Sequence, residues 1–106
     1  MPSAETFLPP SIRRLVERGI QSVDPARVFL FGSRAGGSAR ADSDYDLAFV
    51  FPPEHQGRWL RFVADLDDAA VTLLPVDLVA WTDASESLKR EIELEGVVLY
   101  ERTADA

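Results

Sequence analysis

The chain has 106 residues, of which 46% are hydrophobic, and eleven basic against eighteen acidic side chains give it a formal net charge of −7. This length predicts one domain with a sizeable core, and the acidic balance argues against direct binding of nucleic acid, which requires a basic face. The absence of cysteine excludes disulfides, thiolate zinc sites and cysteine nucleophiles.

The start of the chain shows no targeting signal. The first ten residues, MPSAETFLPP, lack a basic segment followed by an apolar core, so we expect no signal peptide. No apolar stretch approaches the roughly 18 residues that a membrane helix requires. These two features predict a cytoplasmic protein that does not bind a membrane.

The first half of the chain predicts one helix and two strands. Apolar residues recur at helical spacing after Pro9, and Asp24-Pro25 ends that pattern because the residue before a proline disfavours the helical conformation. A wholly apolar segment then indicates a central strand, and Pro52 ends a second one. Because only a short segment joins these strands, we expect antiparallel neighbours. The predicted bounds are a helix over 10–23, a strand over 27–31 and a strand over 44–51.

The second half predicts two helices and two strands in alternation. Trp59 begins a long amphipathic pattern that Pro75 ends, Thr82-Asp83 is expected to cap the last helix, and Gly96 closes it. The predicted bounds are a helix over 56–73, a strand over 75–81, a helix over 83–95 and a strand over 97–101. The complete order predicts a single domain of the α/β or α+β class, with helices packed against a sheet.

A Gly-Ser pair at the end of the first predicted strand is the first candidate for binding chemistry. Gly32 frees backbone N–H groups and Ser33 adds a hydroxyl, which together can hold an anion such as a phosphate. Taken alone, the pair is better interpreted as an ordinary turn. A single helical turn is expected from Ser33, followed by an exposed loop. Arg34 would lie either against a phosphate or in solvent.

Two aspartates open the second predicted strand. Asp44 and Asp46 lie two residues apart, so their side chains share one face of the strand. A phosphate cradle beside a pair of carboxylate ligands is what a magnesium–nucleotide site requires. The sequence therefore predicts such a site where the two strands meet.

A third aspartate, Asp77, stands inside the apolar third strand, where a lone carboxylate is costly unless it is paired or bound to a metal. If that strand lies beside the second, Asp77 faces the same side as Asp44 and Asp46, and the three surround one or two Mg²⁺ ions. Asp77 would then also take the proton of the attacking hydroxyl. The alternative is a buried structural acid that pairs with an arginine.

Three aromatic residues and a histidine lie near these motifs. Tyr45 and Trp59 are interpreted as core residues. Trp81 is interpreted as core or, alternatively, as a stacking partner for adenine. His55 is interpreted as a solvated loop residue.

The set Gly32-Ser33, Asp44-x-Asp46 and distant Asp77 resembles the minimal nucleotidyltransferases of the DNA polymerase β superfamily. Their signature is Gly-Ser, a variable loop, Asp-x-Asp and a third Asp on a following strand. The resemblance extends over about the whole chain and implies a mixed β-sheet flanked by helices. In one departure, Gly36 stands where many relatives carry a second basic residue, which would leave more of the phosphate contact to Arg34 and Arg40.

The resemblance implies transfer of a nucleoside monophosphate, usually AMP from ATP, with release of pyrophosphate. It assigns the nucleotide to Gly32, Ser33 and Arg34. It assigns metal binding, with two Mg²⁺ ions, and catalysis to Asp44, Asp46 and Asp77. Many stand-alone members resemble the antitoxin of a toxin–antitoxin pair, in which the acceptor is a tyrosine of a helical HEPN ribonuclease toxin.

Two other functions remain open at this point. One is nucleotidyl transfer to a small molecule such as an aminoglycoside, for which related enzymes usually carry an additional domain. The other is a toxin-binding module that inhibits without catalysis. Replacement of Asp44 and Asp46 by alanine distinguishes a binder from an enzymatic antitoxin, because a pure binder would still neutralise its partner whereas the enzyme would not. The sequence leaves open the acceptor, the nucleotide preference, and whether the chain forms a homo- or hetero-oligomer.

Overall fold

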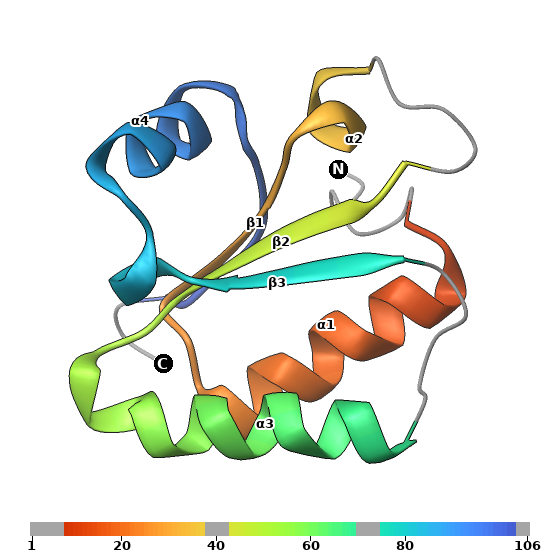
Figure 1. Ribbon diagram of the computed structural model, residues 1–106, viewed down its shortest axis with the longest axis vertical. Coiled ribbons are helices and arrows are strands. Elements are labelled where there is room, and N and C mark those ends of the chain that lie inside the picture. The colour runs from red at the N-terminus through yellow and green to blue at the C-terminus, as the bar shows by residue number, and fades with distance from the viewer. Residues whose placement is uncertain (1–7, 38–42, 70–74, 104–106) are drawn as a thin grey trace.

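The computed structural model describes residues 8–37, 43–69 and 75–103. Helices and strands follow one another along the whole of this part of the chain (Figure 1). In order they are α1 (Pro10–Val23), β1 (Arg27–Phe31), α2 (Ser33–Gly36), β2 (Tyr45–Val50), the 3₁₀ turn η2 (Pro53–His55), α3 (Gln56–Ala69), β3 (Val76–Ala80), the 3₁₀ turn η3 (Trp81–Asp83), α4 (Glu86–Glu95) and β4 (Val97–Glu101).

The four strands form one mixed sheet in the order β3-β2-β1-β4. β1 is antiparallel to both β2 and β4, whereas β2 and β3 run parallel. Helices α1 and α3 cover one face of the sheet, and α4 lies on the other (Figure 1). The predicted fold class, helices flanking a mixed sheet, is therefore confirmed, as is the antiparallel pairing of the first two strands.

The sheet separates two apolar clusters, because successive side chains of a strand point to opposite faces. The larger cluster joins α1 and α3 to Val28 and Leu30 of β1 and to alternate residues of β2. The smaller one joins Ile92 of α4 to Phe29, Phe31 and Ala48. Both faces of β1 are thus buried, as its wholly apolar segment 28–31 predicts.

Aromatic rings fill much of the larger cluster. Trp59 is 5% exposed, and its ring centroid lies 5.3 Å from that of Phe49 and 5.5 Å from that of Phe51. Tyr45 is also buried, so both residues belong to the core as predicted. Trp81 is half-buried, stacks on Phe29 at 6.0 Å and packs against the smaller cluster, contacts that agree with its interpretation as a core residue.

The junction after α1 is more ordered than its sequence indicates. Asp24 ends the helix in the left-handed conformation (φ 53°), which aspartate tolerates, and its carboxylate pairs with Arg102. The Nδ1 atom of His55 lies 3.1 Å from the Asp24 carbonyl oxygen. The interpretation of His55 as a solvated loop residue was therefore wrong: its ring is half-buried and joins η2 to the end of α1.

Several element bounds differ from the predicted ones. The second strand is shorter at both ends than 44–51, and the third ends at Ala80 because Trp81 begins a 3₁₀ turn. The last helix does not start at 83. Its N-cap is Ser85, whose hydroxyl accepts a hydrogen bond from the Leu88 amide at 3.2 Å, so Thr82-Asp83 is not the cap. The helix predicted over 56–73 is observed from Gln56 to Ala69, and 70–74 lie outside the described residues.

Gly96 closes α4 for a steric reason. Its backbone is extended (φ −71°, ψ 157°), so it is not the left-handed cap that a terminal glycine usually supplies. A Cβ atom at this position would lie 2.5 Å from the Ile92 carbonyl oxygen. Among the helices of the described residues, none is both long and apolar enough to cross a lipid bilayer.

Candidate active site

The parallel pairing of β2 and β3 brings two of the three predicted carboxylates together. Asp46 is in register with Asp77 on β3 and with Phe31 on β1. Residues in register on neighbouring strands project from the same face, so the two carboxylates lie side by side on the face that also carries α4. Asp44 precedes β2 directly, one alternation step before Asp46. The third strand thus lies beside the second, which is the condition on which the grouping of Asp77 with the other two aspartates depended.

Asp46 has the electrostatic signature of crowded carboxylates. Burial raises the pKa of Asp46 above its ordinary value of 3.8, and the negative charges of Asp77, Asp44 and Glu91 raise it further. Three other acids thus lie within electrostatic reach of Asp46. A bound cation would offset their repulsion, which is the usual reason for such a grouping at a metal–nucleotide site.

Glu91, on α4, is the acid that the sequence analysis missed. Its neighbour Ile92 is fully buried in the smaller cluster, so the packing of α4 on the sheet carries Glu91 toward Asp46. Nothing in the spacing of the acidic residues along α4 distinguishes Glu91 from Glu93 or Glu95. Only the tertiary placement of the helix identifies it.

Asp77 is exposed, which differs from the expectation of a carboxylate buried in an apolar strand. β3 is an edge strand, and its neighbour in the sheet is β2 on one side only. This exposure excludes the alternative of a buried structural acid paired with an arginine. It also leaves the Asp77 carboxylate accessible to a substrate, and the register with Asp46 becomes the feature that links it to the site.

Gly32 is required where it stands. Its backbone (φ 74°, ψ −156°) lies in a region that L side chains rarely adopt, and a Cβ atom there would overlap the Oδ2 atom of Asp46. The Gly32 carbonyl accepts hydrogen bonds from the amides of Ala35 and Gly36, at 3.1 and 3.2 Å, which shape the short helix α2. The glycine of the Gly-Ser pair therefore lies directly against the carboxylate of the Asp-x-Asp pair.

A cavity of about 440 Å³ opens beside this glycine. On one side of the cavity are the end of β1 and the helix α2, and on the other side is α4. Its lining residues are Phe31, Gly32, Ser33, Gly36, Glu91 and Glu95. Its size suits a small ligand. Because two glutamates face it, a phosphate chain bound here needs cations to neutralise the surrounding negative charge.

Arg34, the third residue assigned to the nucleotide, extends across to the start of β2. Its Nε and Nη2 atoms donate hydrogen bonds to the Ser43 carbonyl oxygen at 3.3 and 3.0 Å. Its guanidinium carbon lies 4.2 Å from the centre of the Tyr45 ring. Arg34 thus joins α2 to the residues on either side of Asp44. Arg40, the other basic residue considered for phosphate contact, lies outside the described residues.

The donor set suits magnesium that arrives with a nucleotide. Within the described ranges, no three His, Cys, Asp or Glu side chains lie close enough to form a complete metal-binding group by themselves. Magnesium does not need one, because it keeps several waters and usually binds through one or two carboxylates together with substrate phosphates. Asp46, which lies against Gly32 and in register with Asp77, fits that kind of half-site, and Asp44 precedes it by one alternation step.

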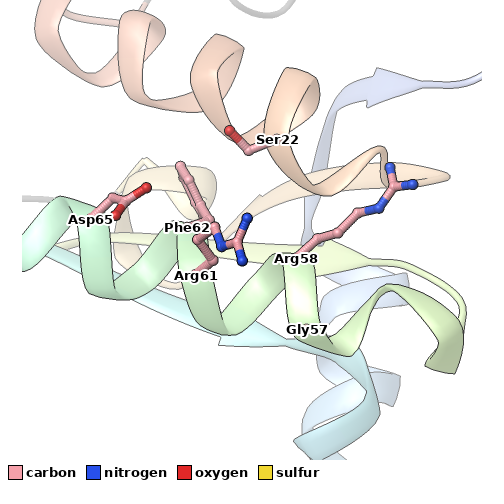
Figure 2. Close-up of a pocket in the computed structure, with 6 residues that line it drawn as sticks. All are labelled: Ser22, Gly57, Arg58, Arg61, Phe62 and Asp65. Atoms are coloured by element: carbon pink, nitrogen blue, oxygen red, sulfur yellow. The ribbon is translucent and has the colours of Figure 1, made fainter.

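A second cavity, of about 360 Å³, lies on the opposite face of the sheet between α1 and α3 (Figure 2). It is lined by Ser22, Gly57, Arg58, Arg61, Phe62 and Asp65. Figure 2 shows Arg58 and Arg61 on α3 and Ser22 on the neighbouring helix α1. No residue predicted from the sequence to bind nucleotide or metal lines this cavity, so the candidate site is on the α4 face.

The sequence profile of the family described as "Polymerase beta, Nucleotidyltransferase" matches residues 15–105. The chain belongs to this family. The matched span includes Gly32, Ser33 and the three aspartates of the candidate site. The resemblance on which the sequence analysis relied is therefore confirmed, and the domain is a transferase by family.

Solved structures share the nucleotidyltransferase fold. A toxin–antitoxin complex with AMP-PNP is similar over 96% of this chain and 77% of that chain, with 23% identity and a TM-score of 0.57. A protein described as a minimal nucleotidyltransferase is similar over 79% and 84%, with 24% identity and a TM-score of 0.58. A variant of the toxin–antitoxin pair MntA–HpeT is similar over 89% and 73%, with 22% identity and a TM-score of 0.54. At these identities the likeness establishes the fold. A search of curated proteins finds no match.

Proposed function

We propose that this nucleotidyltransferase uses Mg²⁺ to transfer a nucleoside monophosphate, AMP from ATP, to a hydroxyl group. The observation that carries the proposal is the position of Gly32 against Asp46, with Asp77 in register beside Asp46. This arrangement supports the proposal because the Gly-Ser turn and the carboxylates of Asp46 and Asp77 lie together on the α4 face. That is the geometry that metal-assisted displacement at phosphorus requires.

Each residue has a distinct role in this mechanism. The backbone at Gly32 and the hydroxyl of Ser33 bind the β- and γ-phosphates. Asp44 and Asp46 would hold a first Mg²⁺, and Asp77 would help to hold a second. The metal supplies charge neutralisation at the phosphates, which the acidic lining of the cavity makes necessary.

The chemical step is an in-line displacement. The acceptor oxygen attacks the α-phosphorus, and the bond from that phosphorus to the oxygen bridging to the β-phosphate breaks. Pyrophosphate leaves with the bonding electrons. Asp77 takes the proton of the acceptor hydroxyl, a role that its exposed position allows.

We infer that the acceptor is a tyrosine of a HEPN-type toxin and that the chain acts as its antitoxin. Two of the similar structures are toxin–antitoxin complexes, and one of these contains AMP-PNP. Aminoglycoside modification remains the second enzymatic candidate. Inhibition by binding alone is the alternative without catalysis, and the crowding of carboxylates around Asp46 argues against it because binding does not require that electrostatic cost.

The test is transfer of radiolabel from ATP in the presence of Mg²⁺, with the product of the neighbouring gene as acceptor. We expect label on the acceptor from α-labelled ATP and none from γ-labelled ATP. Asp44→Ala and Asp46→Ala should each abolish it, whereas Asp65→Ala, which removes an acid on α3, should not. Label from the γ-phosphate would refute nucleotidyl transfer. An unlabelled but inhibited toxin would establish binding without catalysis.

A further inference from the structure

Asp44 is the carboxylate that the sheet does not fix. The register of β2 begins at Tyr45 with β3 and at Asp46 with β1, so Asp44 lies before the first paired residue. Asp44 is also exposed, so packing does not restrain its side chain. Asp46, in contrast, is held by strands on both sides. A ligand set that includes both residues needs another element to position Asp44.

Arg34 contacts the residue on each side of Asp44. It donates two hydrogen bonds to the Ser43 carbonyl, and its guanidinium lies over the Tyr45 ring at 4.2 Å. The Tyr45 amide in turn donates to the Pro75 carbonyl at 2.9 Å, which joins this point to the start of β3. The side chain of Arg34 therefore contacts the chain on both sides of Asp44.

We propose that Arg34 is a positioning residue, which holds Asp44 in place for metal binding by clamping Ser43 and Tyr45. This assignment rests on the proposed function, because it gives Asp44 a metal to bind. It replaces direct contact with the nucleotide as the main role of Arg34. A guanidinium suits the task, since its planar fork can donate twice to one carbonyl while its face stacks on an aromatic ring.

The metal affinity of a variant without Arg34 distinguishes three possible roles of this residue. If Arg34 acts on the site only through its positive charge, its loss should strengthen the binding of a cation. If Arg34 binds nucleotide phosphates, its loss should leave metal affinity in the absence of nucleotide unchanged. A clamp predicts weaker metal binding, because groups that orient metal ligands typically contribute about 10–100-fold to affinity.

The first experiment titrates the full chain with Mn²⁺ in the absence of nucleotide and measures free Mn²⁺ by electron paramagnetic resonance. We expect Arg34→Ala to weaken Mn²⁺ binding about tenfold. Arg34→Lys keeps the charge but not the fork, and it should weaken binding by a smaller factor. Arg58→Ala removes the same charge on the opposite face of the sheet and should leave the affinity unchanged.

The Tyr45 ring provides an independent test. Tyr45→Phe keeps the stacking surface and should bind Mn²⁺ as the wild type does, whereas Tyr45→Leu should weaken binding. Because both side chains belong to one clamp, the double variant Arg34→Ala/Tyr45→Leu should lose no more affinity than the worse single variant. Full additivity of the two losses would refute a shared clamp.

Hydrogen exchange tests the clamp in the absence of metal. In Arg34→Ala we expect faster exchange of the Tyr45 amide and unchanged exchange at Leu47, which lies deeper in the sheet. Arg34→Lys serves if the alanine variant does not fold. Unchanged exchange at Tyr45, or Mn²⁺ affinity that is equal or higher in Arg34→Ala, would overturn the proposal. A failure of label transfer would instead refute the proposed function, and exchange at Tyr45 would still report on the clamp.

Discussion

Gly32 leaves room for the carboxylate of Asp46, and any larger residue at position 32 would occupy the space that this carboxylate fills. The contact joins the two halves of the proposed site, the phosphate-binding turn and the metal-binding pair. It also means that the Gly-Ser motif serves the carboxylates as well as the phosphates.

We therefore expect Gly32→Ala to lower transfer activity about 100-fold, because a displacement of about 1 Å at a reacting centre has effects of that size. The left-handed backbone adds a loss of about 1–3 kcal/mol in the free energy of unfolding. Activity and urea denaturation measure the two effects. Gly57→Ala is the matched control, since a Cβ atom there meets nothing within 4 Å. Wild-type activity in Gly32→Ala would contradict the proposed contact.

The charge of Asp46 should destabilise the metal-free protein. The pKa of Asp46 is raised in the folded state, so the folded state holds this proton more tightly than the unfolded state. The free energy of unfolding therefore falls as the pH rises from 3.8 through the raised pKa. At neutral pH, Asp46→Asn should melt at a higher temperature than the wild type in the presence of EDTA, and the difference should shrink in acid.

The control for this charge effect is Asp65→Asn, which removes an exposed acid far from the site. We expect no comparable gain from it. A lower melting temperature for Asp46→Asn than for the wild type at neutral pH would show that Asp46 stabilises the fold, contrary to the expected repulsion.

With metal and nucleotide bound, the wild type should become more stable than Asp46→Asn, which is the reverse of the order expected in EDTA. A ligand at one hundred times its Kd adds about 2.7 kcal/mol to the free energy of unfolding. The wild type should therefore gain several degrees in Tm when Mg²⁺ and AMP-PNP are added together. Asp46→Asn and Asp77→Asn should gain little, and EDTA should remove the gain from the wild type. An equal shift in Asp77→Asn would exclude Asp77 from the ligands.

Gly19 of α1 lies directly against two aromatic rings of the larger apolar cluster. A Cβ atom there would lie 2.6 Å from the Cε2 atom of Phe49 and 3.0 Å from the Cζ atom of Phe62. Overpacking of this kind should lower the free energy of unfolding of Gly19→Ala by about 2 kcal/mol, more than alanine gains in helix propensity. Gly57→Ala, in α3, should instead be neutral or stabilising. Urea denaturation of both variants distinguishes a steric effect from a propensity effect.

Ser85, the N-cap of α4, should stabilise the fold through its side-chain hydrogen bond. Ser85→Ala should lower the free energy of unfolding by about 1 kcal/mol, because the Leu88 amide loses its acceptor. Thr82→Ala, at the position that the sequence favoured as the cap, should change it by less than about 0.5 kcal/mol. Equal losses in the two variants would contradict the observed N-cap.

Much of the site could be predicted because it depends on local sequence. Gly32 and Asp46 flank one strand-to-strand connection, where alternation along a strand decides which side chains share a face. The adjacency of Asp77 to Asp46 depended on the third strand lying beside the second, which the sequence did not establish, and the exposure of Asp77 was not predicted. A five-residue apolar strand looks the same in sequence at the edge of a sheet as at its centre.

The remainder depends on tertiary packing. Glu91 reaches Asp46 because Ile92 anchors α4 on the sheet, and no periodicity in the helix reports that approach. Ser43 and Tyr45, the partners of Arg34, lie nine and eleven residues further along the chain. The sequence of the connection between β1 and β2 does not indicate these contacts. The start of α4 was misplaced because several capping residues lie close together before it, and only the hydrogen bond to the Leu88 amide distinguishes Ser85.

The division of the core by the sheet has an evolutionary consequence. The residues that α1 and α3 contribute to the larger cluster lie across the sheet from α4, so changes in them bear mainly on folding. The smaller cluster packs α4 on the sheet beside the cavity at Gly32, so changes there alter the lining of this cavity with little effect on the main core. If the cavity holds the nucleotide as proposed, remodelling of α4 can change the nucleotide preference while the main core is kept.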